Sequence, residues 1–476
     1  MIEPPAEPRE PYSPHYRTAL VLTGVGTAGA YHAGVLRAFD EAGVKIDLVA
    51  GRGIGAVSAL FAAVEGAPRL WEPDGIWRRR LPSLYPWRPI VRLAAWALGA
   101  SLLVLVLPLL VLGVGLLVYP IGFLLRVAGL DAGRALVAAY ASWLGAAFEP
   151  SGLPTILPRL VVLALVGVLA ALVVGAVRAR QRGSVLQRER APFWWLAFGA
   201  PLSSGPACRL FRRALWRVAA GLDVRKAPSA TEFSRRYTEL LGENLGQRGF
   251  RELLLVTHDL DTRLDLVFAL VADRHRRRFF LHPPGAGGER RAAEAFDLSG
   301  VARDHLLDAL DASLCLPVAT EPHPVRFTPE HYWRGETHRL ADRPDAVGRV
   351  LTELVAAGVE QVVVVSAVAE LAGPHMLSTR RGTLHGRLSE QLAASEAGAL
   401  RDAAAARAAS FKGLFLIRPA HNPVGPLDFD GCYDERSDRR YTVAELVDRG
   451  YEDAYRQFID PVVGAGGERL AVTGRG

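Results

Sequence analysis

Cysteine is scarce in this chain of 476 residues, where Cys208, Cys315 and Cys432 are odd in number and far apart. They supply neither the paired cysteines of a disulfide framework nor the closely spaced pairs of a zinc site. This scarcity argues against a disulfide-stapled secreted fold, and it fits a reducing cytosolic setting.

Lysine is almost missing as well. It occurs only at positions 45, 226 and 412, although the chain has 56 basic residues and a formal net charge of +7. We attribute the excess of arginine to a GC-rich, bacterial genome rather than to function, and we expect no nucleic-acid partner.

The start of the chain lacks the basic and then apolar pattern of a signal peptide. Residues 1–16 are instead rich in proline and glutamate. Such a composition buries too little apolar surface to fold, so this segment is predicted to be a disordered lead.

Charge is missing from two long stretches in the first half of the chain. Leu93–Leu125 is 33 residues without a charged side chain, and Leu160–Val177 is 18. A helix needs about 20 apolar residues to span a bilayer. We therefore predict transmembrane helices at about 93–118 and 158–177, with Tyr119–Leu125 at the far interface, where tyrosine is enriched.

Arginines flank these stretches on their outer sides, whereas only Arg126, Arg134 and Arg159 lie between them. By the positive-inside rule, both outer flanks face the cytoplasm. We therefore expect a two-pass integral membrane protein whose core faces the cytoplasm. A hairpin buried in a large soluble core is the alternative, and long uncharged runs fit it poorly. The outer arginines are Arg78, Arg79, Arg80, Arg88, Arg92, Arg178, Arg180, Arg182, Arg188 and Arg190.

Aromatic residues follow the second basic cluster. Phe193, Trp194 and Trp195 are predicted to anchor an interfacial linker. Residues 209–217 mix arginines with apolar residues, as in a helix on an anionic membrane surface or an ordinary amphipathic helix packed on the domain. The predicted organisation is a lead at 1–16, a first core part at 17–90, an insertion at 91–180, a linker at 181–204, a second core part at 205–465 and a flexible tail at 466–476.

Strands and helices alternate at the start of the core. Thr18–Leu22 predicts a strand, Ala30–Ala42 a helix and Asp47–Ala50 a second strand. This order implies a parallel sheet with ligands at the carboxyl ends of its strands. The loop that opens the helix contains Gly24, Gly26 and Gly29, and such a loop presents backbone N–H groups to an anion.

A second set of glycines, Gly51, Gly53 and Gly55, follows the second strand. Small residues there allow a sharp elbow between strand and helix that exposes its central residue above the sheet. Together with the glycine loop and the run Gly34–Leu36, this elbow resembles the patatin-like phospholipase family. The resemblance implies an α/β fold, with a parallel-sheet core and helices on both faces, here interrupted by an inserted pair of transmembrane helices.

The family's chemistry is cleavage of acyl esters of membrane lipids by a Ser–Asp dyad, without metal or cofactor. Gly53 stands where the resemblance places the nucleophilic serine, so the attacking hydroxyl is missing. Val25 replaces a glycine of the family's loop, and Ala28 replaces its arginine. The nearest hydroxyl, on Ser58, lies about 5 Å further along the helix.

The second core part continues the resemblance. Ala312–Pro317 is similar to the block that precedes the family's dyad aspartate, and Arg334 stands where that aspartate is expected. Ala346–Ala357 predicts a helix, and Gln361–Ala367 predicts a buried parallel strand. After Arg334 an Asp-Gly pair occurs only at Asp430, which is either a turn residue or a displaced dyad aspartate.

Phe250–Thr257 predicts a strand that ends at Asp259 and Asp261. Two carboxylates at a strand end are more often turn and cap groups than metal ligands. No metal site is therefore expected.

The leading expectation is a membrane-anchored protein that is inactive in Ser–Asp acyl hydrolysis and retains a lipid or acyl pocket for sensing or scaffolding. Its partners would be membrane lipids, and the sequence identifies no protein partner. The alternative is an active lipid acyl hydrolase that uses Ser58 or Ser313 with Asp430. A remote alternative is a dinucleotide-binding protein that uses the glycine loop, with Arg52 placed to suit a 2′-phosphate.

Overall fold

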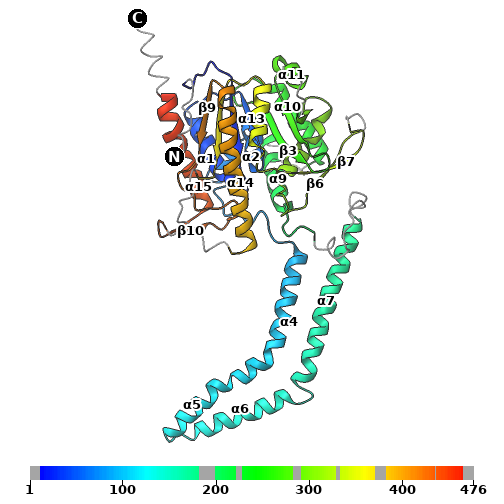
Figure 1. The fold of residues 1–476 in the computed structure, drawn as a ribbon, viewed down its shortest axis with the longest axis vertical. Helices are drawn as coiled ribbons and strands as arrows, with labels where there is room; N and C mark the ends of the chain where they lie inside the picture. Colours follow the sequence, from blue (N-terminus) through cyan, green and yellow to red (C-terminus); the bar gives the residue numbers. More distant parts are fainter. Residues whose placement is uncertain are drawn as a thin grey trace. The chain divides into compact units, whose positions relative to one another are not determined.

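The structure is a computed structural model that describes residues 11–181, 199–220, 228–281, 291–328, 333–369, 382–434 and 436–464 (Figure 1). The chain divides into two compact units. Residues 1–86 and 202–476 form the core unit, and residues 87–201 form the insertion. The predicted anchors Phe193, Trp194 and Trp195 and the predicted tail lie outside the described residues.

The described residues of the core unit form a nine-stranded, mostly parallel sheet. Its order is β5-β4-β3-β2-β1-β8-β9, with β7 paired to β3 and β6 paired to β7. The strands are β1 (Thr18–Thr23), β2 (Leu48–Gly51), β3 (Glu252–Asp259), β4 (Asp265–Leu270), β5 (Ala293–Asp297), β6 (His323–Arg326), β7 (Thr337–Ala341), β8 (Gln361–Ser366) and β9 (Gly413–Ile417). A separate hairpin joins β10 (Cys432–Asp434) and β11 (Arg439–Tyr441).

Helices cover both faces of the sheet (Figure 1). On one face α13 (Val347–Ala356) and α14 (Leu384–Arg407) bury apolar side chains against β1, β2, β3 and β8. On the other face lie α1 (Ala28–Glu41), α2 (Ile54–Ala63) and α12 (Leu306–Ser313), and α15 (Val443–Ala454) packs on α1. The remaining helices of the core unit are α3 (Pro68–Trp71), α9 (Gly205–Ala219), α10 (Ala230–Asn244), α11 (Asp273–Phe280), η2 (Val301–His305), η3 (Ala408–Ser410) and η4 (Tyr455–Gly464).

This arrangement confirms the predicted α/β fold class. The predicted strands at 18–22, 47–50 and 361–367 correspond to β1, β2 and β8 within a residue at each end. The sheet is mixed rather than wholly parallel, because β3 pairs antiparallel with both β4 and β7.

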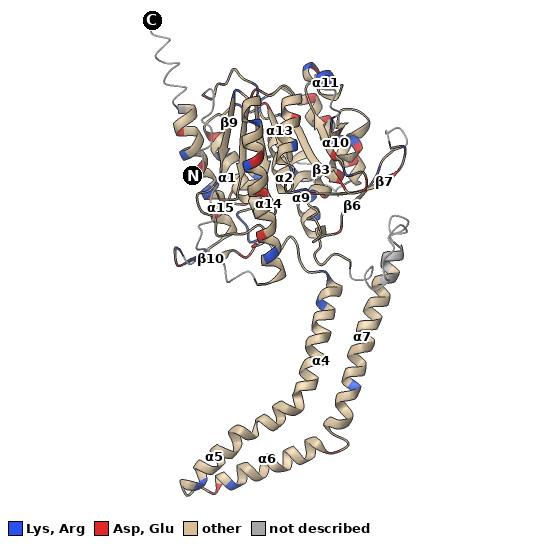
Figure 2. Ribbon diagram, viewed as in Figure 1, with Lys and Arg blue, Asp and Glu red and all other residues tan. Residues whose placement is uncertain are grey.

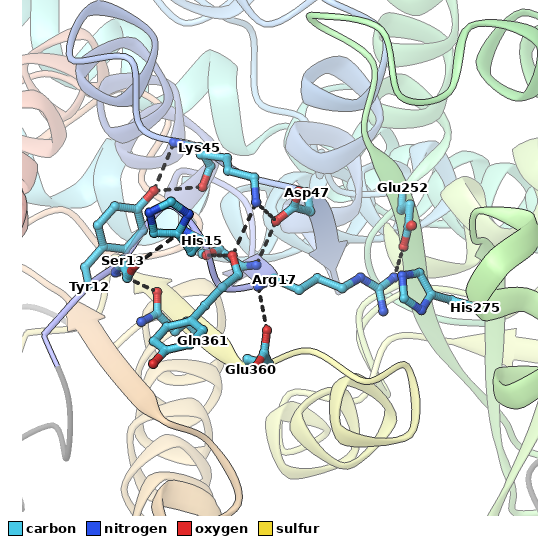
Figure 3. A network of polar contacts seen from close by, with 12 residues as sticks. Tyr12, Ser13, His15, Arg17, Lys45, Asp47, Glu252, His275, Glu360 and Gln361 are labelled. Carbon is cyan, nitrogen blue, oxygen red and sulfur yellow. Dashed lines mark hydrogen bonds and ion pairs between the residues drawn. The ribbon is translucent and has the colours of Figure 1, made fainter.

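Residues 12–16 belong to the predicted disordered lead, but they make defined contacts with the core unit. Figure 3 shows the polar contacts that hold residues 12–17 against the starts of the strands. The Tyr12 hydroxyl donates to the carbonyl of Lys45 at 3.1 Å, and the backbone N–H of Ser13 donates to Gln361 at 3.2 Å. Tyr12 is also buried. These contacts order the end of a segment that composition alone predicts to be disordered.

Helix α9 decides between the two interpretations of residues 209–217. Its apolar side chains Phe211, Leu215 and Trp216 are buried, and Arg212 pairs with Asp311. The helix is therefore an ordinary amphipathic helix packed within the core unit.

The insertion contains α4 (Pro89–Gly113), α5 (Gly115–Val127), α6 (Ala132–Phe148) and α7 (Leu153–Gln181). Two continuous apolar stretches, Pro89–Val127 and Leu153–Gly175, are long enough to cross a membrane. Figure 2 shows how few charged residues these helices carry. Their most apolar windows are only 11% and 0% buried, which is unlike the helices of a soluble core. Helix α6 has no counterpart among the predicted elements.

Helices α1 and α15 approach so closely that glycine is required at their crossing. A Cβ added at Gly34 would lie 1.9 Å from the carbonyl oxygen of Val447, and one at Gly450 would lie 2.2 Å from that of Tyr31. Both obstacles are backbone atoms, so neither can move aside by changing a rotamer. The helix pair is thus fixed by the absence of two side chains.

We predict opposite effects for the same substitution at two helical glycines. Gly34→Ala forces α1 and α15 apart and should lower the free energy of unfolding by about 1–3 kcal/mol or more. Gly398→Ala in α14 meets no atom within 4 Å, so its better helix propensity should raise stability by up to about 1 kcal/mol. Thermal unfolding of the detergent-solubilised variants measures both, and equal shifts in Tm would contradict the close crossing.

Candidate functional site

The elbow has the backbone geometry of a nucleophile turn. Gly53 links β2 to α2 with φ +55° and ψ −134°, a strained conformation that glycine adopts far more readily than other residues. Gly51 and Gly55 allow the sharp turn, because a Cβ at either position would lie within 2.4 Å of a backbone oxygen. The turn is therefore intact, although its central side chain is missing.

The space beside Gly53 is filled by the glycine loop. A Cβ built at Gly53 would lie 2.2 Å from the carbonyl oxygen of Gly24. That same oxygen accepts a hydrogen bond of 2.9 Å from the backbone N–H of Ile54. The residue after a nucleophile normally offers this N–H to the developing oxyanion. Here the carbonyl oxygen of Gly24 already accepts the hydrogen bond from this N–H.

Other contacts close the loop further. The Thr27 backbone N–H donates to the Pro426 carbonyl at 2.9 Å, and its hydroxyl donates to the Gly425 carbonyl at 2.8 Å. A Cβ at Gly29 would lie 2.2 Å from the ring of buried Trp77. The N–H and hydroxyl of Thr27 thus donate to neighbouring carbonyls and are not presented to an anion.

A fully buried ion-pair cluster lies behind the elbow. Arg52 donates to Thr23 Oγ1 at 2.8 Å, to Asp342 Oδ2 at 2.8 Å and to Glu396 Oε2 at 2.9 Å. Glu396 Oε1 accepts a further bond of 2.8 Å from Ser366. All five side chains are buried, and their residues lie on or directly after β1, β2, β7 and β8 and on α14. The cluster therefore occupies the carboxyl edge of the sheet, where ligands bind in open α/β folds.

Two carboxylates in this cluster share one cation. Burial raises the pKa of Asp342 and of Glu396, and the attraction of Arg52 only partly opposes this rise. Burial also disfavours the charge of Arg52, but both carboxylates outweigh it and its pKa is raised. Among the described residues Asp342 Oδ1 has no hydrogen-bond partner. Because one cation faces two carboxylates, one of the two carboxyl groups is favoured in its protonated form.

Asp342 is the functional-site residue that the sequence analysis missed. Its Oδ2 would lie 3.1 Å from a Cβ at Gly53, so a carboxylate does face the elbow. Arg334, expected at this place, is instead exposed in the turn before β7. In the sequence, Asp342 could have been recognised by its position directly after a short strand. This pattern is obscured because Arg343 follows Asp342, where the family has glycine.

The other hydroxyl near the elbow is inaccessible. Ser58 lies 3.3 Å from His32 Nδ1, and His32 Nε2 lies 2.9 Å from the carbonyl oxygen of Thr23. Both side chains are completely buried, and burial lowers the pKa of His32 to about 4. The pair has the composition of a nucleophile and base, but no substrate can reach it in this structure.

Ser313 and Asp430 are not brought to the elbow. The Ser313 hydroxyl donates to the carbonyl of Ala309 within α12 at 2.8 Å. The Asp430 side chain is 74% exposed and lies 3.9 Å from Arg80. Among the described residues no hydrogen bond or ion pair joins Ser313 or Asp430 to Ser58 or to each other, so the rearranged hydrolase site has no geometric support.

Asp259 and Asp261 bind protein groups. Asp259 Oδ2 lies 2.6 Å from His338 Nδ1 and accepts from the hydroxyl of Thr262, while Asp261 pairs with Arg339. These are the turn and cap contacts expected at a strand end. Within the described part of the chain no group of three or more His, Cys, Asp or Glu side chains is arranged to hold a metal ion.

Much of the chain matches one protein family. The family model described as patatin-like phospholipase matches residues 20–342. Patatin-like phospholipase domain-containing protein 6 from Mus musculus and from Homo sapiens is 43% identical over 67 residues, which is 14% of this chain. The match spans only 5% of the length of those relatives. VipD from Legionella pneumophila aligns over 95% of this chain and 67% of its own, with 11% identity and a TM-score of 0.30.

We predict that Arg52→Met destabilises the protein in a pH-dependent way. Removing one partner of a buried ion pair costs about 3–5 kcal/mol. The folded-state pKa values of Asp342 and Glu396 are raised, so their stabilising contribution is complete below about pH 4 and is lost as pH rises through the raised values. Without Arg52 these values rise further. Chemical denaturation should therefore show a larger loss at pH 8 than at pH 5.

Arg251→Met is the matched control. The Arg251 side chain is half-buried and its guanidinium donates to the carbonyl of Ala62 at 2.6 Å, and among the described residues no carboxylate forms an ion pair with it. Its removal should cost the same stability at both pH values. An equally pH-independent loss for Arg52→Met would show that Arg52 does not hold the two carboxylates.

Proposed function

This chain belongs to the patatin-like phospholipase family, and we propose that it is a membrane-anchored member that has lost Ser–Asp acyl hydrolysis. One observation carries this proposal. The carbonyl oxygen of Gly24 fills the space where the side chain of residue 53 would begin, and it accepts a hydrogen bond from the N–H of Ile54. The nucleophile is missing, and the protein itself occupies a donor of the oxyanion hole.

The base of the dyad is also restrained. Asp342 faces the elbow, but its Oδ2 is paired with Arg52 at 2.8 Å inside the buried cluster. A catalytic base must accept a proton from the nucleophile at the working pH. A carboxyl held in an ion pair and closed off from solvent is poorly suited to that role.

Membrane anchoring is supported by the two long apolar helical stretches of the insertion. Arginines concentrate on their outer flanks, which favours a two-pass topology with both flanks in the cytoplasm. The core unit lies in sequence outside the two stretches on both sides. An even number of crossings is therefore required to keep its parts on one side of the membrane.

We place the lipid-binding part of the proposal in a cavity away from the elbow. This cavity of about 370 Å³ is bounded by α1, α3, β1 and β2. Leu36, Phe39, Val49 and Trp71 contribute apolar walls, and Arg251 lies among the polar groups of its lining. Its size falls within the range of about 300–1,000 Å³ that small-molecule sites have. An acyl chain bound there would serve sensing or scaffolding, because the cavity holds no dyad.

The two alternatives receive less support. An active hydrolase with a new nucleophile needs Ser58 or Ser313 beside a base, and the buried pair of Ser58 with His32 is closed to substrate. A dinucleotide-binding role needs Arg52 to reach a phosphate, but its guanidinium is already bound to Asp342 and Glu396.

We predict that neither the parent protein nor Gly53→Ser hydrolyses acyl esters. Loss of a catalytic serine costs on the order of 10⁶ in kcat, and in the variant the new Cβ meets the Gly24 carbonyl. Release of fatty acid from phospholipids, lysophospholipids and short-chain esters by the purified, detergent-solubilised protein measures this. Gly53→Ala is the matched control, because it adds the same Cβ without the hydroxyl.

Each positive result has a distinct meaning. Turnover by the parent protein that Ser58→Ala abolishes would overturn the proposal in favour of the rearranged hydrolase. Turnover by Gly53→Ser alone, abolished by Asp342→Asn, would show that the loop opens and that Asp342 still serves as a base. The parent protein would then be inactive only through the missing hydroxyl.

For the cavity, we predict that lipid co-purifies with the protein and depends on the free space. Val44 is buried and lines the cavity, so Val44→Trp should displace an acyl occupant. Val301→Trp makes the same change at an exposed position of the core unit and should leave the occupant bound. Mass spectrometry of extracted lipids measures both, and equal lipid content in the two variants would remove the cavity from the proposal.

A further inference from the structure

Helix α4 is long enough to finish crossing a bilayer before α5 begins. Its 25 residues extend about 37 Å at 1.5 Å per residue, against a hydrocarbon core of about 30 Å. Helices α5 and α6 have 13 and 17 residues. They extend only about 20 and 26 Å, so neither is suited to another full crossing. They therefore need a different place in the membrane.

A specific set of contacts ends α4 at this point. The helix breaks at Gly113–Gly115, and the Tyr140 hydroxyl of α6 lies 3.0 Å from the carbonyl oxygen of Val111 and 3.2 Å from that of Leu112. A Cβ at Gly115 would lie 2.9 Å from this hydroxyl. In hydrocarbon, carbonyls freed by a helix break must find a donor within the protein. Tyr140 supplies that donor, so the break is stabilised in a way that suits a membrane.

Beyond the break, α5 and α6 pack on each other as a hairpin that turns away from α4 and α7 (Figure 1). They approach each other closely at two glycines, because a Cβ at Gly133 would lie 2.5 Å from the carbonyl oxygen of Gly122. The tip of the hairpin carries Arg126, Asp131 and Arg134 (Figure 2). Close packing and a charged tip make the hairpin a defined element rather than a loose loop.

The side chains of the hairpin match an interface between lipid and water. Leu116 and Leu124 are 80% and 64% exposed, which water alone would penalise. Tyr140 lies 5.8 Å from Tyr119 and 6.3 Å from Trp143 between ring centroids. Tyrosine and tryptophan gather at the level of lipid headgroups, so this aromatic group marks the interface at the point where the hairpin begins.

We propose that α5 and α6 form a hairpin that lies in the headgroup region of the leaflet opposite the core unit, with its apolar sides in contact with lipid. This inference rests on the proposed membrane anchoring. The partner is the lipid surface itself. The two arginines at the tip, opposed by one aspartate, suit the phosphates of the headgroups. A second copy of the chain would cover the apolar sides but would leave the charged tip and the aromatic group unexplained.

The experiment measures the depth of single fluorescent probes in the full-length protein reconstituted into phosphatidylcholine and phosphatidylglycerol vesicles. Leu103 and Leu165, exposed near the middles of α4 and α7, are the deep references, and Leu124 and Leu136 report on the hairpin. Each is replaced by cysteine and labelled in a Cys432→Ser background. Cys208 and Cys315 can stay, because burial raises the pKa of both thiols, that of Cys315 to about 12.

Lipids brominated near the headgroup or near the chain ends quench the probes at different depths. Probes at Leu124 and Leu136 should be quenched more by the shallow lipids, and probes at Leu103 and Leu165 more by the deep lipids. In addition, Leu130→Cys near the tip, in the same Cys432→Ser background, should react with a membrane-impermeant thiol reagent only after the vesicles are permeabilised. A parallel sample of the parent protein, which keeps Cys432, reports how much of the core unit faces outward.

Each other outcome overturns a distinct statement. Deep quenching at Leu124 and Leu136 would place the hairpin within the hydrocarbon. Quenching there by aqueous iodide but by neither lipid would place it in water. Absence of lipid quenching at Leu103 and Leu165 as well would overturn the membrane anchoring itself. In Tyr140→Phe the broken helix loses its donor, and the difference in depth between Leu103 and Leu124 should shrink; an unchanged difference would show that Tyr140 does not set the break.

Discussion

The buried position of Arg52 is the constraint on which the rest of the site depends. Its guanidinium joins Thr23 at the end of β1, Asp342 after β7 and Glu396 on α14. Each of these elements is held in place, because withdrawing any one would leave a hydrogen-bonding group of the cluster without its partner away from water. The same bonds that fix the carboxyl edge of the sheet also immobilise the carboxylate that faces the elbow. The stability of this edge and the proposed loss of hydrolysis thus rest on one set of contacts.

The elbow and the glycine loop are in direct contact. In an active member the strained turn carries a serine, whose Cβ would hold the loop at a distance. With glycine at position 53 that barrier is gone, and the Gly24 carbonyl closes onto the Ile54 N–H. The closed loop then excludes a side chain from the position that it covers. A serine introduced at residue 53 alone therefore meets the Gly24 carbonyl, whose oxygen would lie 2.2 Å from the new Cβ.

Local sequence patterns predicted the local structure, but they could not predict contacts between residues far apart in the chain. Uninterrupted apolar residues gave β1 and β8, and closely spaced glycines gave the elbow. Asp342 and Glu396 lie 290 and 344 residues from Arg52 in the chain, and no spacing rule connects such partners. The insertion shows the same limit. Pro108 and Pro120 interrupt the apolar run but lie inside helices. The break between α4 and α5 lies instead at Gly113–Gly115, where Tyr140 of another helix contacts the carbonyls of Val111 and Leu112.

The division of the core unit by the insertion governs the order in which the fold can be completed. Strand β2 ends at Gly51, but its partner β3 begins at Glu252, and β8, the other neighbour of β1, begins at Gln361. At about 5–20 residues per second, a ribosome needs roughly 10–40 s between β2 and β3. During that interval β1 and β2, whose residues are all buried in the folded protein, have no partners on their outer edges. Such edges are templates for aggregation. Production of the folded protein therefore depends on keeping this half-made sheet from pairing with other chains until β3 and β8 are made.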